Sequence, residues 1–229
     1  MCGILAILNL GRVRSNNGEL RNQALSMVKK IRHRGPDWSG SYSDERALIL
    51  HERLSIVDVE HGAQPLIDRQ NGNVLAVNGE IYNHKDLREQ LKQPHDFQTA
   101  SDCEVLLYLY AEEHPRQFLN RVNGIFAFVL YDPTGNTFLI ARDPIGINPL
   151  YVGWDRHENL YVASEMKALA GVCERIQEFH QDTTTWVMKR KRDFRSTTSP
   201  NGLSQVFTPP TLTIQPACGL PWKPPFTVS

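Results

Sequence analysis

The chain begins Met1-Cys2-Gly3-Ile4-Leu5-Ala6-Ile7-Leu8, a stretch that predicts both a buried strand and a reactive group beside it. Residues 3–9 are predicted to form a buried strand, because Gly3 to Leu8 is a short apolar run. If the initiator methionine is removed, Cys2 carries its thiol and its α-amino group on one Cα. Nucleophile and base then come from the same residue. Taken alone, a small residue that starts a buried strand is the simpler interpretation of Cys2.

A free α-amine on Cys2 could act as the base for the thiol of the same residue. An α-amino group has a reference pKa of about 8, so a substantial fraction is neutral near physiological pH and can accept a proton. The thiol would attack a carbonyl carbon while the amine takes up the thiol proton, directly or through one water.

Composition limits the other functions that the chain can have. Its 229 residues, 41% of them apolar, fit one domain of about 170–180 residues plus a tail. Twenty-five basic residues balance 25 acidic ones, so the net charge indicates neither nucleic acid nor a membrane surface as a partner. The apolar runs are short, and the N-terminus lacks the pattern of a secretory signal. We therefore expect no nucleic-acid or membrane partner.

The cysteines favour a reducing environment. Cys2, Cys103, Cys173 and Cys218 are far apart and form no C-x-x-C pair. This spacing argues against a zinc site and against a disulfide framework. We expect no metal ligands and a cytoplasmic location.

The order of predicted elements indicates the fold class. Residues 20–31 have helical periodicity, and that helix must end before Arg34-Gly35-Pro36-Asp37 because proline cannot continue it. Other helices are predicted at 86–92, from 101 (a Ser101-x-x-Glu104 capping box) and at 165–169. Further strands are predicted at 46–51, 74–78, 150–154 and 159–164, with a hairpin that joins an alternating run from 125 to 137–142. Strands, then helices, then strands favour an α+β fold with largely antiparallel sheets.

Candidate binding groups lie at the ends of three predicted elements, at Arg53, at Asn78-Gly79 and at Asp102. Arg53 can clamp a carboxylate with two hydrogen bonds, although a surface ion pair is the commoner role of an arginine. Asn78 and Gly79 can supply two oxyanion donors, although an Asn-Gly pair is more often a turn. Asp102 can hold an ammonium group, and the helix dipole also explains its place in a first turn.

Together with Cys2, these stretches resemble the glutaminase domain of class II glutamine amidotransferases, the N-terminal nucleophile type, and more narrowly that of glutamine-hydrolysing asparagine synthetases. The resemblance covers about residues 1–179. The matching stretches are MCGI (1–4), RHRGPDWSG (32–40), HERLSIVD (51–58), GAQPL (62–66), NGEIYN (78–83), SDCE (101–104), GIFAF (124–128), RDPIG (142–146) and SEMKAL (164–169).

The resemblance implies a role for each candidate residue. Cys2 would form a glutamyl thioester, with Asn78 and Gly79 as oxyanion donors. Free glutamine is a zwitterion, so its binding site needs a cation for the carboxylate and acceptors for the ammonium group. The substrate-binding residues implied are Arg53 for the carboxylate, Glu80 and Asp102 for the ammonium group, and Ile56 and Val57 for backbone contacts. The implied fold is a four-layer αββα sandwich of two largely antiparallel sheets.

The expected activity is hydrolysis of L-glutamine to glutamate and ammonia, without a cofactor, as the glutaminase part of asparagine biosynthesis. Residues 180–229 are basic at first and then rich in Ser, Thr and Pro, and we expect a disordered tail there. The synthetase domain, which would bind ATP and Mg²⁺, is expected to be absent. A synthetase subunit or a second copy of the chain is the expected protein partner. The alternative is a catalytically incomplete fragment that binds glutamine or a synthetase.

Overall fold

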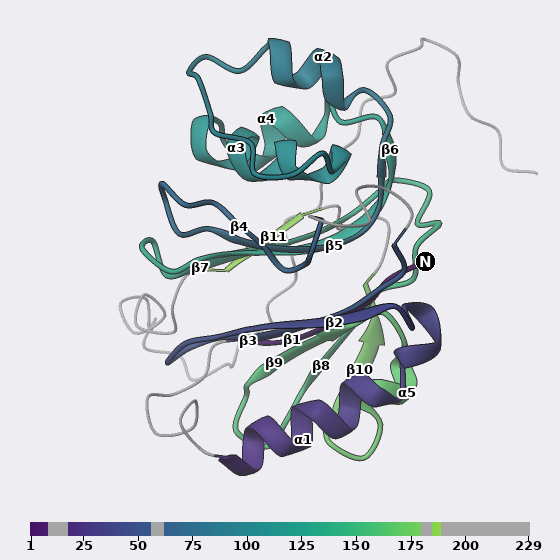
Figure 1. Ribbon diagram of the computed structural model, residues 1–229. Helices are drawn as coiled ribbons and strands as arrows, with labels where there is room; N and C mark the ends of the chain where they lie inside the picture. Colours follow the sequence, from purple (N-terminus) through teal and green to yellow (C-terminus); the bar gives the residue numbers. More distant parts are fainter. Residues whose placement is uncertain (9–17, 56–61, 180–184, 189–229) are drawn as a thin grey trace, which may run out of the picture.

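The computed structural model describes residues 1–8, 18–55, 62–179 and 185–188. Two antiparallel sheets are stacked face to face, and helices cover the outer face of each sheet (Figure 1). The layers run from α2, α3 and α4, through the two sheets, to α1 and α5. The predicted αββα sandwich is therefore confirmed.

The first sheet, here called sheet A, contains the N-terminal strand in its interior. Its order is β10-β8-β9-β1-β3-β2, and every pairing is antiparallel. The bounds are β1 Gly3–Leu8, β2 Trp38–Ser43, β3 Leu48–Arg53, β8 Tyr151–Trp154, β9 Leu160–Ala163 and β10 Arg175–Glu178. All six residues of β1 are buried because β3 and β9 flank it and both of its faces are covered.

The second sheet, sheet B, has the order β11-β7-β6-β5-β4, again with every pairing antiparallel. The bounds are β4 Leu66–Ile67, β5 Val74–Ile81, β6 Gly124–Asp132, β7 Thr137–Arg142 and β11 Thr185–Met188. The long β5–β6 pairing, from Val74 opposite Tyr131 to Ile81 opposite Gly124, forms its central part.

Helices complete the outer layers. On sheet A lie α1 (Gly18–Lys29), the short 3-10 turn η1 (Arg32–Arg34) and α5 (Met166–Leu169). On sheet B lie α2 (His84–Glu89), the 3-10 turn η2 (Asp102–Glu104), α3 (Val105–Glu112) and α4 (Pro115–Leu119). No helix of the described residues is long and apolar enough to cross a membrane.

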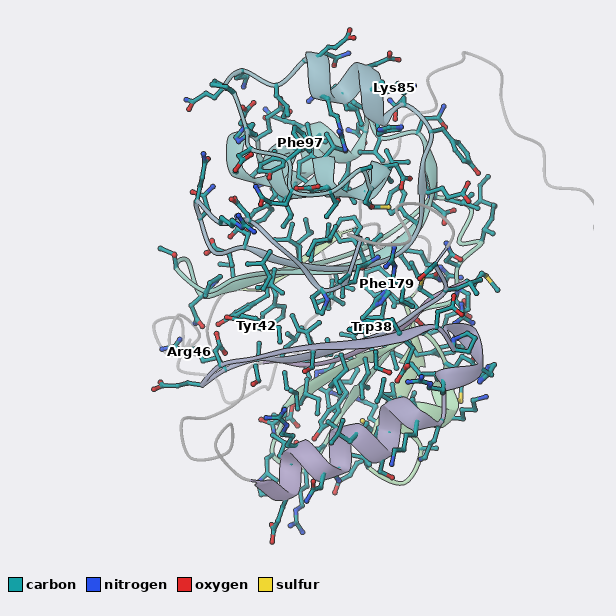
Figure 2. The ribbon with its side chains drawn as sticks, viewed as in Figure 1. Trp38, Tyr42, Arg46, Lys85, Phe97 and Phe179 are labelled. Carbon is teal, nitrogen blue, oxygen red and sulfur yellow. The ribbon has the colours of Figure 1, made fainter. Side chains whose placement is uncertain are left out.

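Alternation along the strands divides the core into layers, because successive side chains point to opposite faces of a sheet. Ile4, Ala6 and Leu8 belong to the cluster between the sheets, whereas Leu5 and Ile7 pack with the apolar face of α1. Phe179 also lies between the two sheets (Figure 2).

Three local expectations need correction. The predicted capping box is not formed as a reciprocal pair, because Ser101 accepts from the Cys103 amide while the Glu104 carboxylate bonds the amides of Gln98 and Thr99. β2 was not expected, since its sequence WSGSYS has no apolar run. Sheet B also extends into the segment expected to be a tail, through β11. The other residues of 180–229 lie outside the described part.

Candidate active site

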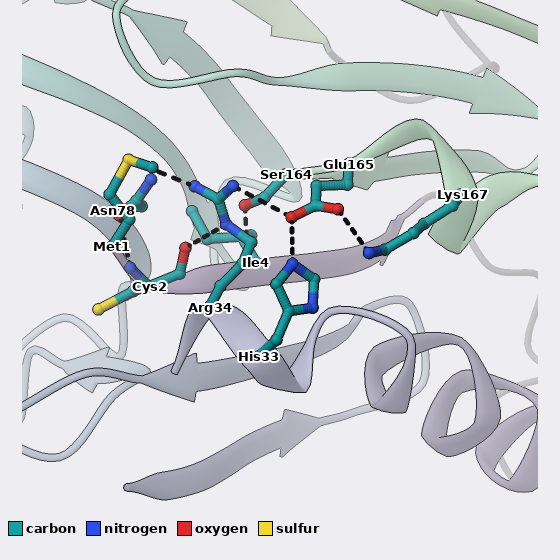
Figure 3. Close-up of polar contacts among 9 residues, drawn as sticks. All are labelled: Met1, Cys2, Ile4, His33, Arg34, Asn78, Ser164, Glu165 and Lys167. Carbon is teal, nitrogen blue, oxygen red and sulfur yellow. Dashed lines mark hydrogen bonds and ion pairs between the residues drawn. The ribbon is translucent and has the colours of Figure 1, made fainter. Parts of the chain in front are cut away.

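Cys2 lies where β1 begins, beside the end of a strand from the other sheet. Its backbone nitrogen donates a hydrogen bond to Oδ1 of Asn78 in β5, at 2.7 Å (Figure 3). Its sulfur lies 3.4 Å from the donating amide nitrogen of Leu54, just after β3. The first residues of sheet A are thus attached to β5 of sheet B.

The Cys2 thiol is protonated at neutral pH. Burial raises its pKa above the ordinary value, and this effect outweighs the Leu54 hydrogen bond and the positive charges of the N-terminus, Arg53 and Arg34, which all lower it. The thiolate is the nucleophilic form of cysteine. A reaction at this sulfur therefore needs a base that removes the proton.

Arg34 holds the main chain of Cys2, a role that the sequence did not suggest. Its side chain is only 7% exposed. Nε donates to the carbonyl oxygen of Cys2 at 2.9 Å, and Nη1 donates to Oε1 of Glu165 at 3.2 Å (Figure 3). The sequence explained Arg34-Gly35-Pro36-Asp37 as a helix stop, and η1 does end there. The same turn also directs a guanidinium group at Cys2.

Glu165 in turn fixes the guanidinium group of Arg34. His33 contacts Oε1 at 2.9 Å and Lys167 contacts Oε2 at 2.9 Å. Burial alone would raise the pKa of the Glu165 carboxyl, but the hydrogen bonds from Lys167 and Arg34 and the His33 contact hold it below the ordinary value. Beside it, Ser164 Oγ accepts from the Ile4 amide at 2.9 Å. The start of β1 is held by polar contacts on this side.

Asn78 presents a donor without a partner. Its side chain is buried, with 2% of the residue exposed, and Oδ1 is used by Cys2. The amide nitrogen Nδ2 is also buried and has no hydrogen-bond partner among the described residues. A buried donor without a partner is costly, so it marks a place where an acceptor fits.

The next residue must be glycine. Gly79 has φ of 154°, a conformation that residues with a side chain rarely adopt. A Cβ on Gly79 would also overlap the Ile125 carbonyl oxygen on β6. The Asn78-Gly79 pair is therefore part of a strand and not the turn that base rates favour.

Glu80, Asp102 and Cys103 gather around the same end of β5. Asp102 Oδ2 accepts from the Ile81 amide at 2.6 Å, and Cys103 Sγ lies 3.6 Å from the Gly79 carbonyl oxygen. Burial raises the pKa of the Cys103 thiol well above its ordinary value, and the charges of Asp102, Cys2 and Glu80 raise it further. Cys103 was not among the predicted site residues, and a buried cysteine in a helix turn gives no sequence signal.

Arg53 is the last residue of β3, and its positive charge is one of the effects that lower the pKa of the Cys2 thiol. It is buried, whereas the simpler expectation placed it at the protein surface. The predicted contacts at Ile56 and Val57 lie outside the described residues. Of the predicted site residues that the structure describes, all lie at the adjoining ends of β1, β3 and β5 or in η2.

One cavity of the described residues lies away from Cys2. It has a volume of about 470 Å³ and is lined by residues of α1 and of the turns around Asp155 and Gly171. Of the predicted site residues, none that the structure describes lines it. We therefore base the candidate site on the hydrogen bonds and unpaired donor around Cys2, not on cavity size.

Known proteins match this chain over most of its length. The model of the glutamine amidotransferase domain family matches residues 1–212. Asparagine synthetase B [glutamine-hydrolyzing] of Escherichia coli is 52% identical over 186 residues, which are 81% of this chain and 33% of that protein. Asparagine synthetase [glutamine-hydrolyzing] 2 of Arabidopsis thaliana is 49% identical over 179 residues, which are 78% of this chain and 30% of that protein. The chain thus spans about a third of the length of these relatives.

Solved structures support the fold. A glutamine phosphoribosylpyrophosphate amidotransferase from B. subtilis aligns with a TM-score of 0.58 at 22% identity, over 82% of this chain and 49% of that one. A structure titled as the allosteric regulatory enzyme of purine biosynthesis aligns with a TM-score of 0.60 at 24% identity, over the same shares. At these identities the likeness concerns the fold alone.

Proposed function

The chain belongs to the glutamine amidotransferase domain family, and from this membership we propose that it hydrolyses L-glutamine to glutamate and ammonia through a thioester on Cys2. The observation that carries the proposal is the pairing of Cys2 with Asn78. The Cys2 nitrogen bonds Oδ1, and the unpartnered Nδ2 of the same amide is left for another acceptor.

Before the first turnover, hydrolysis of the Met1–Cys2 peptide bond must release Met1 and leave Cys2 with a free α-amine. This amine takes the thiol proton, and the sulfur attacks the side-chain carbonyl carbon of glutamine. The carbonyl oxygen becomes an oxyanion, for which Asn78 Nδ2 and the Gly79 N–H are the proposed donors. The α-ammonium then gives its proton to the departing nitrogen, the C–N bond breaks and ammonia leaves. Water attacks the thioester, glutamate is released and the thiol is restored.

Substrate recognition follows from the charges at the site. Arg53 is the proposed partner of the α-carboxylate, and Glu80 and Asp102 are the proposed partners of the α-ammonium group. The burial of Arg53 supports this assignment, because a buried guanidinium binds a carboxylate strongly. Ile56 and Val57 remain proposed backbone contacts. No cofactor takes part in this scheme.

The use of the ammonia is a separate proposal. The part that matches this chain is only about a third of each relative named as an asparagine synthetase, which supports a synthetase subunit or domain as the acceptor of ammonia. ATP and Mg²⁺ would act there, in asparagine formation. A second copy of this chain is the other proposed protein partner. The free thiols of Cys2 and Cys103 fit the cytoplasm, where cysteines remain reduced.

Glutamate release from glutamine tests the proposal. The purified chain with a free Cys2 amine is compared with Cys2→Ala and with the same chain carrying an uncleaved N-terminal extension. We expect glutamate from the processed chain only. Equal release by the Cys2→Ala variant would contradict the proposal. Tight glutamine binding without any release would favour a binding module instead.

A further inference from the structure

The strand that carries the proposed oxyanion donors extends beyond its neighbour. β4 pairs only with the first part of β5, with Leu66 opposite Leu75 and Ile67 opposite Val74. The same register continued along the chain would place Gln64 opposite Val77. Val77 therefore lies on an edge of sheet B that no described strand covers, directly before Asn78.

Two side chains, of Gln64 and His51, bind the backbone of Val77 where β4 no longer pairs with β5. Gln64 Oε1 accepts a hydrogen bond from the Val77 amide at 2.8 Å. His51 Nε2 lies 3.0 Å from the Val77 carbonyl oxygen, reaching from β3 of sheet A across to sheet B. Because a carbonyl oxygen only accepts, Nε2 of this histidine carries the proton. Both polar groups of Val77 are thus fixed by side chains from separate segments.

Of the two ring nitrogens of His51, only Nε2 has a hydrogen-bond partner among the described residues. The histidine is fully buried, with 0% of the residue exposed. Burial lowers its pKa to about 4, so that the ring is neutral at physiological pH. A neutral ring keeps the proton on Nε2 and gives the contact with Val77 a fixed direction.

A third side chain holds the following peptide. Asn148, in the loop after β7, donates through Nδ2 to the Asn78 carbonyl oxygen at 3.0 Å, and this contact is buried. Gln64 itself is held where it is by close packing, because a Cβ on Gly40 of β2 would overlap the Gln64 carbonyl oxygen. Three separate segments therefore converge on the two residues that precede Gly79.

We propose that Gln64, His51 and Asn148 are positioning residues, which hold the peptides of Val77 and Asn78 so that the oxyanion donors face the Cys2 thiol. They touch neither the substrate nor the reacting atoms. This role rests on the proposed function. Water can satisfy an exposed strand edge, but it does not fix the direction of a peptide as three side chains do. Donors aimed at the oxyanion need this fixed geometry, because they act by being in place before charge develops.

Gln64 is the best residue for the test, because it is only partly buried and its replacement is tolerated more readily than that of a core side chain. Gln64→Met keeps the length of the side chain and removes the acceptor, whereas Gln64→Glu restores an acceptor at the same reach. Gln70→Met, an exposed glutamine between β4 and β5, is the matched control. All variants are measured as the full chain with a free Cys2 amine.

We expect Gln64→Met to lower kcat for glutamate release by about tenfold or more, less than the 10²–10³ for loss of a donor itself. KM should stay within about twofold, Gln64→Glu should recover most of kcat, and Gln70→Met should match the unmodified chain. Alkylation of Cys2 by iodoacetamide, which creates no oxyanion, should proceed at the same rate in all four proteins. Amide hydrogen exchange in residues 78–81 should be faster in Gln64→Met alone.

Other results overturn the inference. An unchanged kcat with unchanged exchange in Gln64→Met would show that the edge needs no side-chain partner. A raised KM with normal kcat would make Gln64 a substrate contact instead. If the unmodified chain releases no glutamate, the proposed function fails, and exchange alone then decides the positioning role. Equal exchange in Gln64→Met and Gln64→Glu would overturn it in that case.

Discussion

The two sheets meet at the candidate site, but their polar groups there differ in whether they have hydrogen-bond partners. On sheet A, the groups around Cys2 have their partners, with Arg34 on the carbonyl oxygen and Glu165 on the guanidinium. On sheet B, the end of β5 leaves one buried donor unpaired, the Asn78 amide nitrogen. Sheet A fixes the main chain of Cys2, whereas sheet B presents the unpaired amide nitrogen of Asn78 to a hydrogen-bond acceptor.

This difference suggests how the work is divided between the sheets. A nucleophile needs a fixed position, so its main chain is anchored by hydrogen bonds. An oxyanion donor must be free until the charge appears, so its own partner is missing in the resting protein. Replacement of Asn78, His51 or Arg34 removes in turn the free donor, the contact of His51 with Val77 that links the sheets, and the anchor of the Cys2 main chain. The effects should decrease in that order.

Removal of the free donor should have the largest effect. Asn78→Ala should lower kcat for glutamate release by about 10²–10³, equivalent to about 3–4 kcal/mol of transition-state stabilisation. The measurement is steady-state glutamate release, with Asn71→Ala in the turn between β4 and β5 as the control. A fall of less than threefold would mean that the unpaired amide nitrogen is not an oxyanion donor.

The burial of His51, whose contact with Val77 links the sheets, should make the free energy of unfolding depend on pH in the acid range. The pKa of His51 is lowered by burial from 6.5 to about 4, so the unfolded chain binds a proton at higher pH than the folded one. Stability should therefore fall as pH drops from 6.5 to about 4, by about 3 kcal/mol in total from this group. Denaturant unfolding at several pH values measures it.

The matched variant for that titration is His51→Gln, which keeps a donor near Val77 and cannot titrate. Its free energy of unfolding should depend less steeply on pH across this window than that of the unmodified chain. Parallel curves for the two proteins would mean that His51 binds its proton equally well in the folded and unfolded states.

Loss of the anchor should cost less. Arg34→Met keeps the aliphatic part of the side chain and removes its hydrogen bonds to Cys2 and Glu165. We expect the free energy of unfolding at pH 7 to fall by about 2 kcal/mol, as for other hydrogen bonds to charged groups. Arg156→Met, at an exposed turn, should change it little. Equal values for the two variants would show that the hydrogen bonds of Arg34 do not stabilise the fold.

The smallest effect belongs to the outer ion pairs. The pKa of the Glu165 carboxyl is lowered from 4.5, so its contribution is present above pH 4.5 and is lost as pH falls through the folded pKa. Glu165→Gln should reduce stability by about 1 kcal/mol at pH 7. The difference from the unmodified chain should vanish in acid. A difference that stays constant with pH would point to packing.

Much of the fold was predictable because local patterns carry it. The apolar run of β1, the helical spacing of α1 and the alternation around Phe126 each indicate one element. β2 was not predictable in this way. Its six residues are polar or partly exposed, and their pairing with β3 at the edge of sheet A makes them a strand.

The residues of the candidate site likewise fall into those that a local sequence pattern indicates and those that it does not. Cys2, Asn78 and Asp102 could be named because they follow or precede elements within recognisable stretches, and the structure does bring them together. Arg34, Gln64 and His51 were not assigned a role in the site. Each acts through a hydrogen bond to a distant segment, and no local pattern encodes such a contact.

In the proposed mechanism, Cys2 on sheet A forms a covalent intermediate and Asn78 on sheet B stabilises its formation. The most direct test is acid quenching of the processed chain during turnover with glutamine, followed by mass spectrometry of the N-terminal peptide. We expect a glutamyl adduct on Cys2 that forms much more slowly in Asn78→Ala. Glutamate release without any adduct on Cys2, or with an adduct on another residue, would contradict this mechanism.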